Sequence, residues 1–165
     1  MGPRFFSREP HGSFPAPTHT FRAMAHQFSQ THRVEFSDTD AAGMVHFTAF
    51  FRWMEQTEHA FYRSLGGQAY ERTAHGEFGV PRVHASCDFL QPVGYGDQVE
   101  VAITVQEKGS RKLTYGVQFR SPPGEAVVAT GTMTVVSAFR PADGGPFRSV
   151  SLPEPLGRGI TLSDV

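Results

Sequence analysis

Residues 34–55 read VEFSDTDAAGMVHFTAFFRWME and join two different hydrophobic periods. Upstream, Phe28, His32, Val34 and Phe36 alternate with polar residues, which is typical of a half-buried strand that ends at the turn Asp38-Thr39-Asp40. Downstream, apolar residues recur at steps of three, four or seven, which predicts a helix from about residue 46 to 65. Its apolar face holds Phe47, Phe50, Phe51, Met54, Phe61 and Leu65, and Gly66-Gly67 ends it.

Beyond the helix, four alternating runs predict strands near residues 79–90, 99–105, 113–119 and 127–139. A short helical piece is expected over 68–75. The turn at 108–110 predicts a hairpin between the second and third of these runs. A strand, one long helix and four sequential strands indicate the α+β class, with a mostly antiparallel sheet covered by that helix.

The two ends of the chain differ in composition from its middle. Residues 1–25 hold four prolines among scattered Gly, Ser and His, which predicts a loose tail; its arginines and few acids also leave an organelle transit peptide open. Residues 141–165 are rich in Pro and Gly and are expected to be an irregular extension. One domain over residues 26–140 remains, which suits a chain of 165 residues.

Bulk composition excludes several classes of function. A net charge of −1 offers no large positive field, so nucleic acid is not an expected partner. No apolar run approaches the roughly 20 residues of a membrane span. The single cysteine, Cys87, excludes an internal disulfide and a cysteine-based zinc cluster, and favours a reducing compartment, here taken as the cytoplasm. Cys87 shares its strand face with Val83, Ala85 and Phe89, so we expect an inert core thiol.

The stretch 34–47, continued through 51–55, resembles the signature of the 4-hydroxybenzoyl-CoA thioesterase family. The similarity extends through Cys87-Asp88-Phe89, Pro92 and Tyr95-Gly96-Asp97. This resemblance implies the hotdog fold, in which a curved five-stranded sheet wraps around one long helix. It also implies homodimers with active sites at the subunit interface, often assembled into homotetramers.

The resemblance further implies an acyl-CoA thioesterase with Asp40 as its catalytic carboxylate, either attacking the thioester carbon or activating water. It makes the backbone N–H of Phe47 the main donor to the thioester oxygen, with His46 beside it. The residues alone support the same site, because Gly43 permits close approach and the helix start offers unpaired amides to an oxyanion. Partial desolvation at a closed interface should strengthen the Asp40 carboxylate as a nucleophile or base. No cofactor is expected, since coenzyme A is part of the substrate.

Other candidates have structural interpretations beside the functional ones. Asp38 is expected to form a turn or cap, and the Asp38/Asp40 pair is not expected to hold a metal. Glu58 falls within the apolar helix stripe, where a buried carboxylate needs a partner; it either assists the chemistry or is a hydrogen-bonded interface residue. Arg111 and Lys112 either meet the phosphates of coenzyme A or belong to an ordinary solvated turn.

The sequence thus predicts hydrolysis of a short or medium acyl-CoA or an aroyl-CoA. Two alternatives remain open at this stage. A hotdog shell can hold an acyl group without cleaving it, because a fold does not fix a function. A hotdog dehydratase would need an acid/base pair such as Asp40 with His46.

Overall fold

The computed structural model describes residues 26–122 and 126–162 of the chain, so the predicted tail over residues 1–25 lies outside the described part. Strand β1 (Gln27–Arg33) leads through the short 3-10 helix η1 (Phe36–Asp38) into the long helix α1 (Phe47–Ser64). The elements that follow are β2 (Tyr70–Thr73), β3 (Gly76–Gly79), β4 (Arg82–Phe89), β5 (Gln98–Lys108), β6 (Lys112–Ser121), β7 (Ala126–Val136), β8 (Ala138–Pro141), β9 (Arg148–Ser149) and α2 (Leu156–Gly159).

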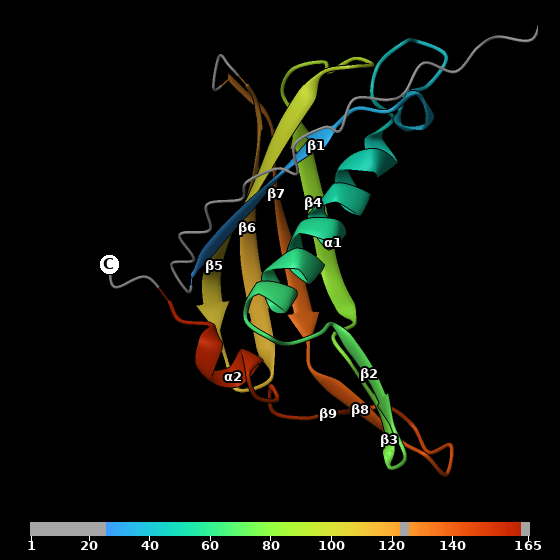
Figure 1. The fold of residues 1–165 in the computed structure, drawn as a ribbon, viewed down its shortest axis with the longest axis vertical. Helices are drawn as coiled ribbons and strands as arrows, with labels where there is room; N and C mark the ends of the chain where they lie inside the picture. The colour runs from blue at the N-terminus through green and yellow to red at the C-terminus, as the bar shows by residue number, and fades with distance from the viewer. Residues whose placement is uncertain (1–25, 123–125, 163–165) are drawn as a thin grey trace, which may run out of the picture.

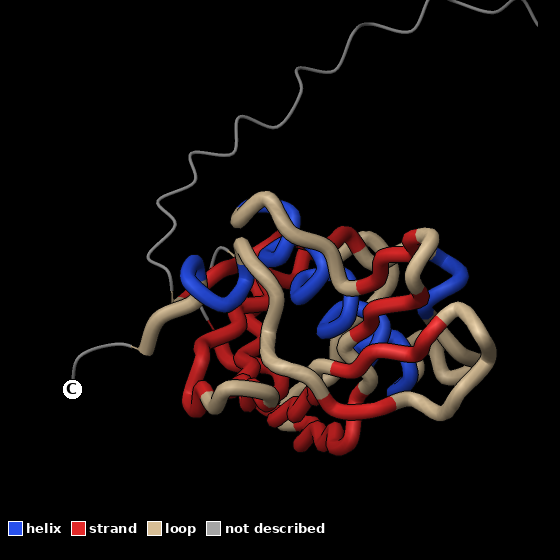
Figure 2. The backbone as a smooth tube through the Cα atoms, turned by 90° about the horizontal axis from the view of Figure 1, so that it is seen from below, coloured by secondary structure: helices blue, strands red, loops and turns tan. Residues whose placement is uncertain are grey.

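The main sheet has five strands in the order β1-β5-β6-β7-β4, and all neighbouring strands are antiparallel. Helix α1 crosses one face of this sheet (Figure 1). Seen from below, the helical segments lie to one side of the curved band of strands (Figure 2). The expected α+β architecture, with one long helix against a five-stranded sheet, is therefore confirmed.

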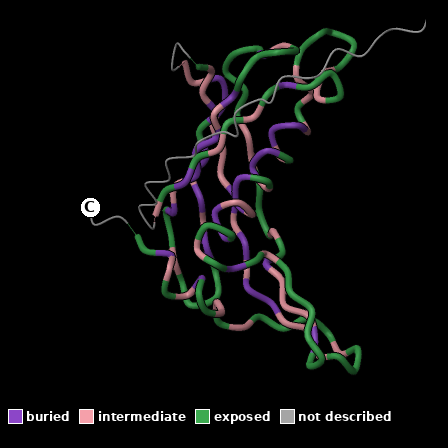
Figure 3. Tube along the Cα trace, viewed as in Figure 1, coloured by how far each residue is buried: buried purple, intermediate pink, exposed green. Residues whose placement is uncertain are grey.

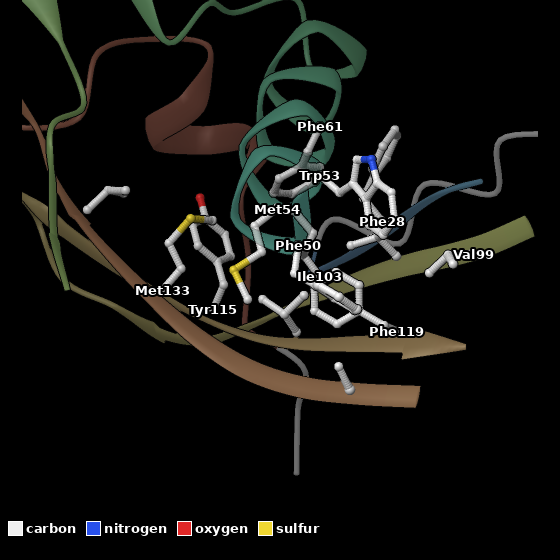
Figure 4. Close-up of a cluster of buried hydrophobic side chains, with 14 of the residues drawn as sticks. Phe28, Phe50, Trp53, Met54, Phe61, Val99, Ile103, Tyr115, Phe119 and Met133 are labelled. Atoms are coloured by element: carbon white, nitrogen blue, oxygen red, sulfur yellow. The ribbon is translucent and has the colours of Figure 1, made fainter. Parts of the chain in front are cut away.

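The core lies between α1 and the concave side of the sheet. The buried face of α1 presents aromatic and sulfur-containing side chains to β5 and β6 (Figure 4), and the rings of Phe50 and Phe119 lie 5.1 Å apart. A Cβ atom on Gly131 of β7 would stand 2.5 Å from Met54 Cε and 2.4 Å from the carbonyl oxygen of Ser86. The missing side chain at residue 131 therefore lets the helix lie close to the sheet. Buried residues follow α1 and the central strands (Figure 3).

A second, four-stranded sheet extends from the end of the first and was not predicted. Its order is β2-β3-β8-β9, and only residues 80–81 and Ser137 separate β3 and β8 from β4 and β7. The β3/β8 pair continues the β4/β7 pair as an arm (Figure 1). Strand β2 occupies residues 70–73, so the expected helical piece at 68–75 was wrong. Residues 70–73 pair with β3, and β3 pairs with β8, so sheet pairing decides the conformation of this segment.

The C-terminal segment also differs from the irregular extension that its composition suggests. It contains β9 and α2, and the side chains of Leu156 and Ile160 are fully buried in the core cluster. Lys108 Nζ donates to the carbonyl oxygens of Gly157, over 2.6 Å, and Ile160. A cation at the end of a helix satisfies carbonyls that have no partner within it, so this short helix is tied to β5.

Strand β4 is an edge of the main sheet, and one of its faces is less covered than its alternation suggests. Val83 is 63% exposed and Phe89 is 49% exposed, while Cys87 is half-buried and packs against the core. The face shared by these residues was expected to lie in the core.

Within the described residues, no helix is long and apolar enough to cross a bilayer.

Candidate active site

The loop that carries Asp40 doubles back between β1 and α1. The amide of Asp40 donates to the carbonyl of Met44, and the amide of Gly43 donates to the carbonyl of Asp40, both over 2.9 Å. Thr39 and Val45 form an isolated antiparallel bridge across the loop. Gly43 has a φ of +74°, a left-handed conformation that glycine adopts without steric cost. The loop therefore returns Asp40 to the beginning of α1.

The carboxylate of Asp40 is held through one oxygen. Its Oδ1 accepts a hydrogen bond of 2.8 Å from the amide of Ala42, which is the local turn that an Asp in this position favours. Among the described residues no donor binds Oδ2. One oxygen thus fixes the orientation of the group while the other is open for chemistry.

A cavity of about 420 Å³ opens beside Asp40. Its walls come from the loop, the first turns of α1 and the segment after β4, and they are formed by Asp40, Met44, Val45, Phe47, Phe50 and residues 89–93. The rings of Phe50 and Phe89 meet edge to face at 5.0 Å. Phe47 is 55% exposed and Leu90 is 57% exposed. The cavity therefore combines one exposed carboxylate with aromatic and aliphatic walls.

The first turn of α1 provides backbone donors at the same cavity. His46 is the residue before the helix, and its Nδ1 accepts from the amide of Thr48 over 3.4 Å. The amide of Ala49 donates to the carbonyl of His46 over 2.9 Å. In the described part of the chain no acceptor pairs with the amide of Phe47. Since α1 begins at Phe47, this amide is a helix N-terminal donor without a helical partner. Asp40 on the loop and Phe47 at the helix start thus line one cavity.

Glu58 is buried as its helical position predicted, and its partners are now identified. It is fully buried, accepts from Tyr62 Oη over 2.7 Å and forms an ion pair with Arg82. Tyr62 Oη lies 2.9 Å from Tyr115 Oη. Burial raises the pKa of Glu58 above its ordinary value, although Arg82 and the hydrogen bond from Tyr62 act in the opposite direction. The same burial raises the pKa of Tyr62 and Tyr115.

The position of Glu58 separates it from the Asp40 cavity. Glu58 is eleven positions after Phe47 in the helix, which is about 16 Å along the axis. A second cavity of about 480 Å³ lies at this end of α1, lined by Glu55, His59, Tyr70, Arg82 and Phe147 among others. Arg82 Nη1 also binds Glu55 Oε1 over 2.8 Å. Glu58 therefore belongs to a buried network at the other end of the helix.

Arg111 and Lys112 lie even farther from Asp40. Lys112 begins β6 and Arg111 directly precedes it, next to the end of β5. The Asp40 loop instead bridges through Met44 to Gly94, just before β5 starts. Strand β5 has 11 residues, so about 33 Å separates its two ends. The two regions occupy opposite ends of the sheet (Figure 1). Lys112 Nζ pairs with Glu107 over 2.9 Å, which fits the interpretation as a solvated turn.

Several contacts of the site could not be predicted from local sequence. Phe89 and Val93 line the cavity because the end of β4 lies beside α1, a contact that depends on tertiary structure. Arg52 binds Asp38 over 2.7 Å, which gives Asp38 the structural role expected of it. Because Arg52 and Asp38 are 14 residues apart, no local sequence motif predicts this contact. Within the described residues no three His, Cys, Asp or Glu side chains are grouped as metal ligands.

Comparison with known proteins identifies the family of the chain. Residues 34–157 match the family model described as the thioesterase-like superfamily. A 1,4-dihydroxy-2-naphthoyl-CoA hydrolase from Synechococcus sp. is 39% identical over 83 residues, which are 46% of this chain and 54% of that protein. The match thus spans about half the length of that relative. The 4-hydroxybenzoyl-CoA thioesterase of Pseudomonas sp. is 25% identical over 134 residues, which are 79% of this chain and 94% of that protein.

The fold comparison extends over most of the chain. A 1,4-dihydroxy-2-naphthoyl-CoA thioesterase structure from Synechocystis superposes with a TM-score of 0.69, covering 81% of this chain and 95% of that one. The two sequences are 22% identical, so the likeness concerns the fold. It confirms the hotdog fold that the stretch 34–55 predicted.

Proposed function

Because the chain belongs to the thioesterase-like superfamily, we propose that it hydrolyses the thioester bond of an acyl-CoA at the Asp40 cavity. One observation carries the proposal: a carboxylate with an open oxygen and a helix N-terminal residue with an unpaired amide line the same apolar cavity. Thioester hydrolysis needs these two groups, one to act on the carbonyl carbon and one to stabilise the oxygen.

The reaction follows from the chemistry of these groups. The thioester oxygen accepts a hydrogen bond from the amide of Phe47, and this bond strengthens as negative charge develops on the oxygen. Asp40 either attacks the carbonyl carbon, forming an anhydride that water then cleaves, or removes a proton from an attacking water. In both routes the carbon–sulfur bond breaks, and one water is consumed to give a carboxylic acid and the free thiol. The reaction calls for no cofactor.

The cavity favours an aromatic or a short to medium acyl group. Phe47, Phe50 and Phe89 provide flat apolar walls around a volume of about 420 Å³. Such walls suit an aryl ring, which packs on aromatic side chains in offset or edge-on contacts. The names of the Synechococcus and Pseudomonas relatives refer to aroyl-CoA substrates, which supports this preference.

A homodimer through β4 is part of the proposal. In the described part of the chain, β4 is an edge of the main sheet and carries exposed apolar residues, a surface that soluble proteins seldom leave open. Antiparallel pairing of two β4 strands would set Arg82 of one copy near Phe89 of the other. The second cavity of one copy would then adjoin the Asp40 cavity of its partner. Arg111 and Lys112 could meet coenzyme A only from another copy of the chain, and the homotetramer that the family resemblance implies would supply such a copy. The lone half-buried thiol of Cys87 fits a cytoplasmic location.

The test is thiol release from benzoyl-, hydroxybenzoyl- and straight-chain acyl-CoA esters by wild-type protein and by Asp40→Asn. Asparagine retains the oxygen that accepts from Ala42, so the loop should fold. Asp143→Asn is a matched control, because Asp143 Oδ1 accepts in the same way from the amide of Gly145 at 3.2 Å, in the arm.

We expect Asp40→Asn to lose about 100- to 10,000-fold in turnover, the usual contribution of a carboxylate that transfers a proton or attacks. Asp143→Asn should match the wild type. Unchanged turnover in Asp40→Asn would refute the assignment. Saturable binding of every ester without release would favour the acyl-binding module. Sedimentation velocity on the same samples tests the dimer, which a monomer at all concentrations would contradict.

A further inference from the structure

A set of four side chains joins the two segments that carry the Asp40 carboxylate and the Phe47 amide. Asp38 stands two residues before Asp40, and its carbonyl accepts from the amide of His46 over 2.8 Å. Its carboxylate Oδ1 binds Arg52 Nη2 over 2.7 Å. The other guanidinium nitrogen, Nη1, donates to Thr48 Oγ1 over 3.3 Å. Thr48 Oγ1 in turn lies 2.7 Å from His46 Nδ1. We call Asp38, Arg52, Thr48 and His46 the Arg52 network.

The geometry assigns the donors within this network. Nδ1 of His46 accepts from the backbone N–H of Thr48, so it carries no proton. The short contact between Thr48 Oγ1 and the same Nδ1 is then a hydrogen bond donated by the threonine hydroxyl. That leaves the lone pairs of Thr48 Oγ1 for Arg52. The chain of hydrogen bonds therefore runs in one direction from Arg52 to His46.

The Arg52 network holds the residues on both sides of the proposed oxyanion donor, the backbone amide of Phe47. Phe47 lies between His46 and Thr48, and both neighbours are held by side-chain hydrogen bonds. At the other end, Asp38 Oδ2 accepts from the amide of Glu35 over 3.0 Å, which anchors the start of the loop. Arg52 bridges the two ends because its planar guanidinium donates in two directions at once.

We propose that Arg52 is a positioning residue that fixes the Phe47 amide relative to the Asp40 carboxylate, an inference that rests on the proposed function. Arg52 touches neither group itself. It acts through Asp38 on the loop and through Thr48 and His46 on the first turn of α1. A displacement of about 1 Å between reacting groups lowers turnover by up to about 100-fold, so a fixed separation has catalytic value.

The Arg52 network should contribute little to the stability of the fold. The side chain of Arg52 is 47% exposed, and ion pairs so open to solvent contribute little to folding. The loop is already closed by backbone hydrogen bonds and the Thr39–Val45 bridge. Removing the guanidinium should therefore alter the geometry of the site more than the stability of the fold.

The experiment compares Arg52→Met, Arg52→Lys and a control, Arg63→Met, in the full chain with benzoyl-CoA. Arg63 is an exposed arginine in the last turn of the same helix, remote from the Asp40 cavity. We expect Arg52→Met to lower kcat by about 10- to 100-fold with KM changed less than about 2-fold. Lysine has one ammonium group in place of the two-branched guanidinium, so Arg52→Lys should retain part of the kcat that Arg52→Met loses. Arg63→Met should match the wild type.

A double variant separates positioning from two independent contributions. If Asp38 and Arg52 act through one network, Asp38→Asn combined with Arg52→Met loses no more kcat than the worse single variant. Multiplied losses, or an unchanged kcat with a lowered melting temperature, would overturn the positioning role. Full turnover in Asp40→Asn would refute the proposed function itself. An inactive Asp40→Asn together with an unaffected Arg52→Met would overturn the positioning role alone.

Discussion

Replacing Gly43 by alanine separates backbone strain from catalysis at the Asp40 loop. Gly43 has a φ of +74°, and a Cβ atom built there meets no atom within 4 Å. The cost of Gly43→Ala is therefore conformational, about 1–2 kcal/mol for the left-handed region. A gain of about 0.4–1 kcal/mol from the stiffer unfolded chain offsets part of it. The net loss of about 1 kcal/mol corresponds to a fall of about 2–4 °C in Tm for a chain of this size.

Gly144 provides the matched control, because its φ is +86° and its Cβ position is equally open. Gly144→Ala should lower Tm by the same amount and leave turnover unchanged, since residue 144 lies in the arm. Gly43→Ala should also lower kcat, because the strained loop moves Asp40 relative to the Phe47 amide. Thermal unfolding and thiol release from benzoyl-CoA measure the two effects. Equal Tm shifts with full turnover in both variants would refute a catalytic role for the loop geometry.

Two further predictions concern buried ionisable groups. Burial raises the pKa of Glu58 above its ordinary value of 4.5, so the folded chain holds this proton more tightly than the unfolded chain does. Stability should therefore fall as pH rises from that ordinary value through the raised one. Glu58→Gln should flatten this slope in urea unfolding measured from pH 4.5 upward; parallel pH curves would contradict this. Burial also raises the pKa of the Cys87 thiol to about 11. About 0.1% thiolate at pH 8 should leave Cys87 nearly unreactive toward a disulfide reagent until the protein is denatured, and rapid labelling of native protein would contradict it.

Local patterns in the sequence were sufficient for the elements that carry the site. The helix predicted over residues 46–65 is α1 at 47–64, because its apolar spacing and the glycine pair that follows it are both local signals. The hairpin at 108–110 is confirmed for the same reason, since one turn joins two alternating strands. Asp40, Gly43 and the helix start fall within a single short stretch, so their proximity required no knowledge of long-range contacts.

Elements held by remote partners could not be read in this way. Residues 70–73 form β2 in a hairpin with β3, and β3 is in turn held by β8, which lies much farther along the chain. Likewise Leu156 and Ile160 lie in a Pro- and Gly-rich segment that resembles a loop, yet they complete the core beside the end of β5. In both places tertiary contacts override weak local preferences.

Glu58 and its ion-pair partner separate what helical spacing in the sequence predicts from what only the strand register decides. Helical spacing alone placed its carboxylate on the buried face, and burial alone required a partner. The partner, Arg82, begins β4, and no periodicity connects residues 24 positions apart. Only the antiparallel registers of the sheet, which set the beginning of β4 beside the end of β7 and the beginning of β6, decide that this arginine reaches the helix. A charge can therefore be placed in the core from sequence, whereas its counter-charge follows from strand register.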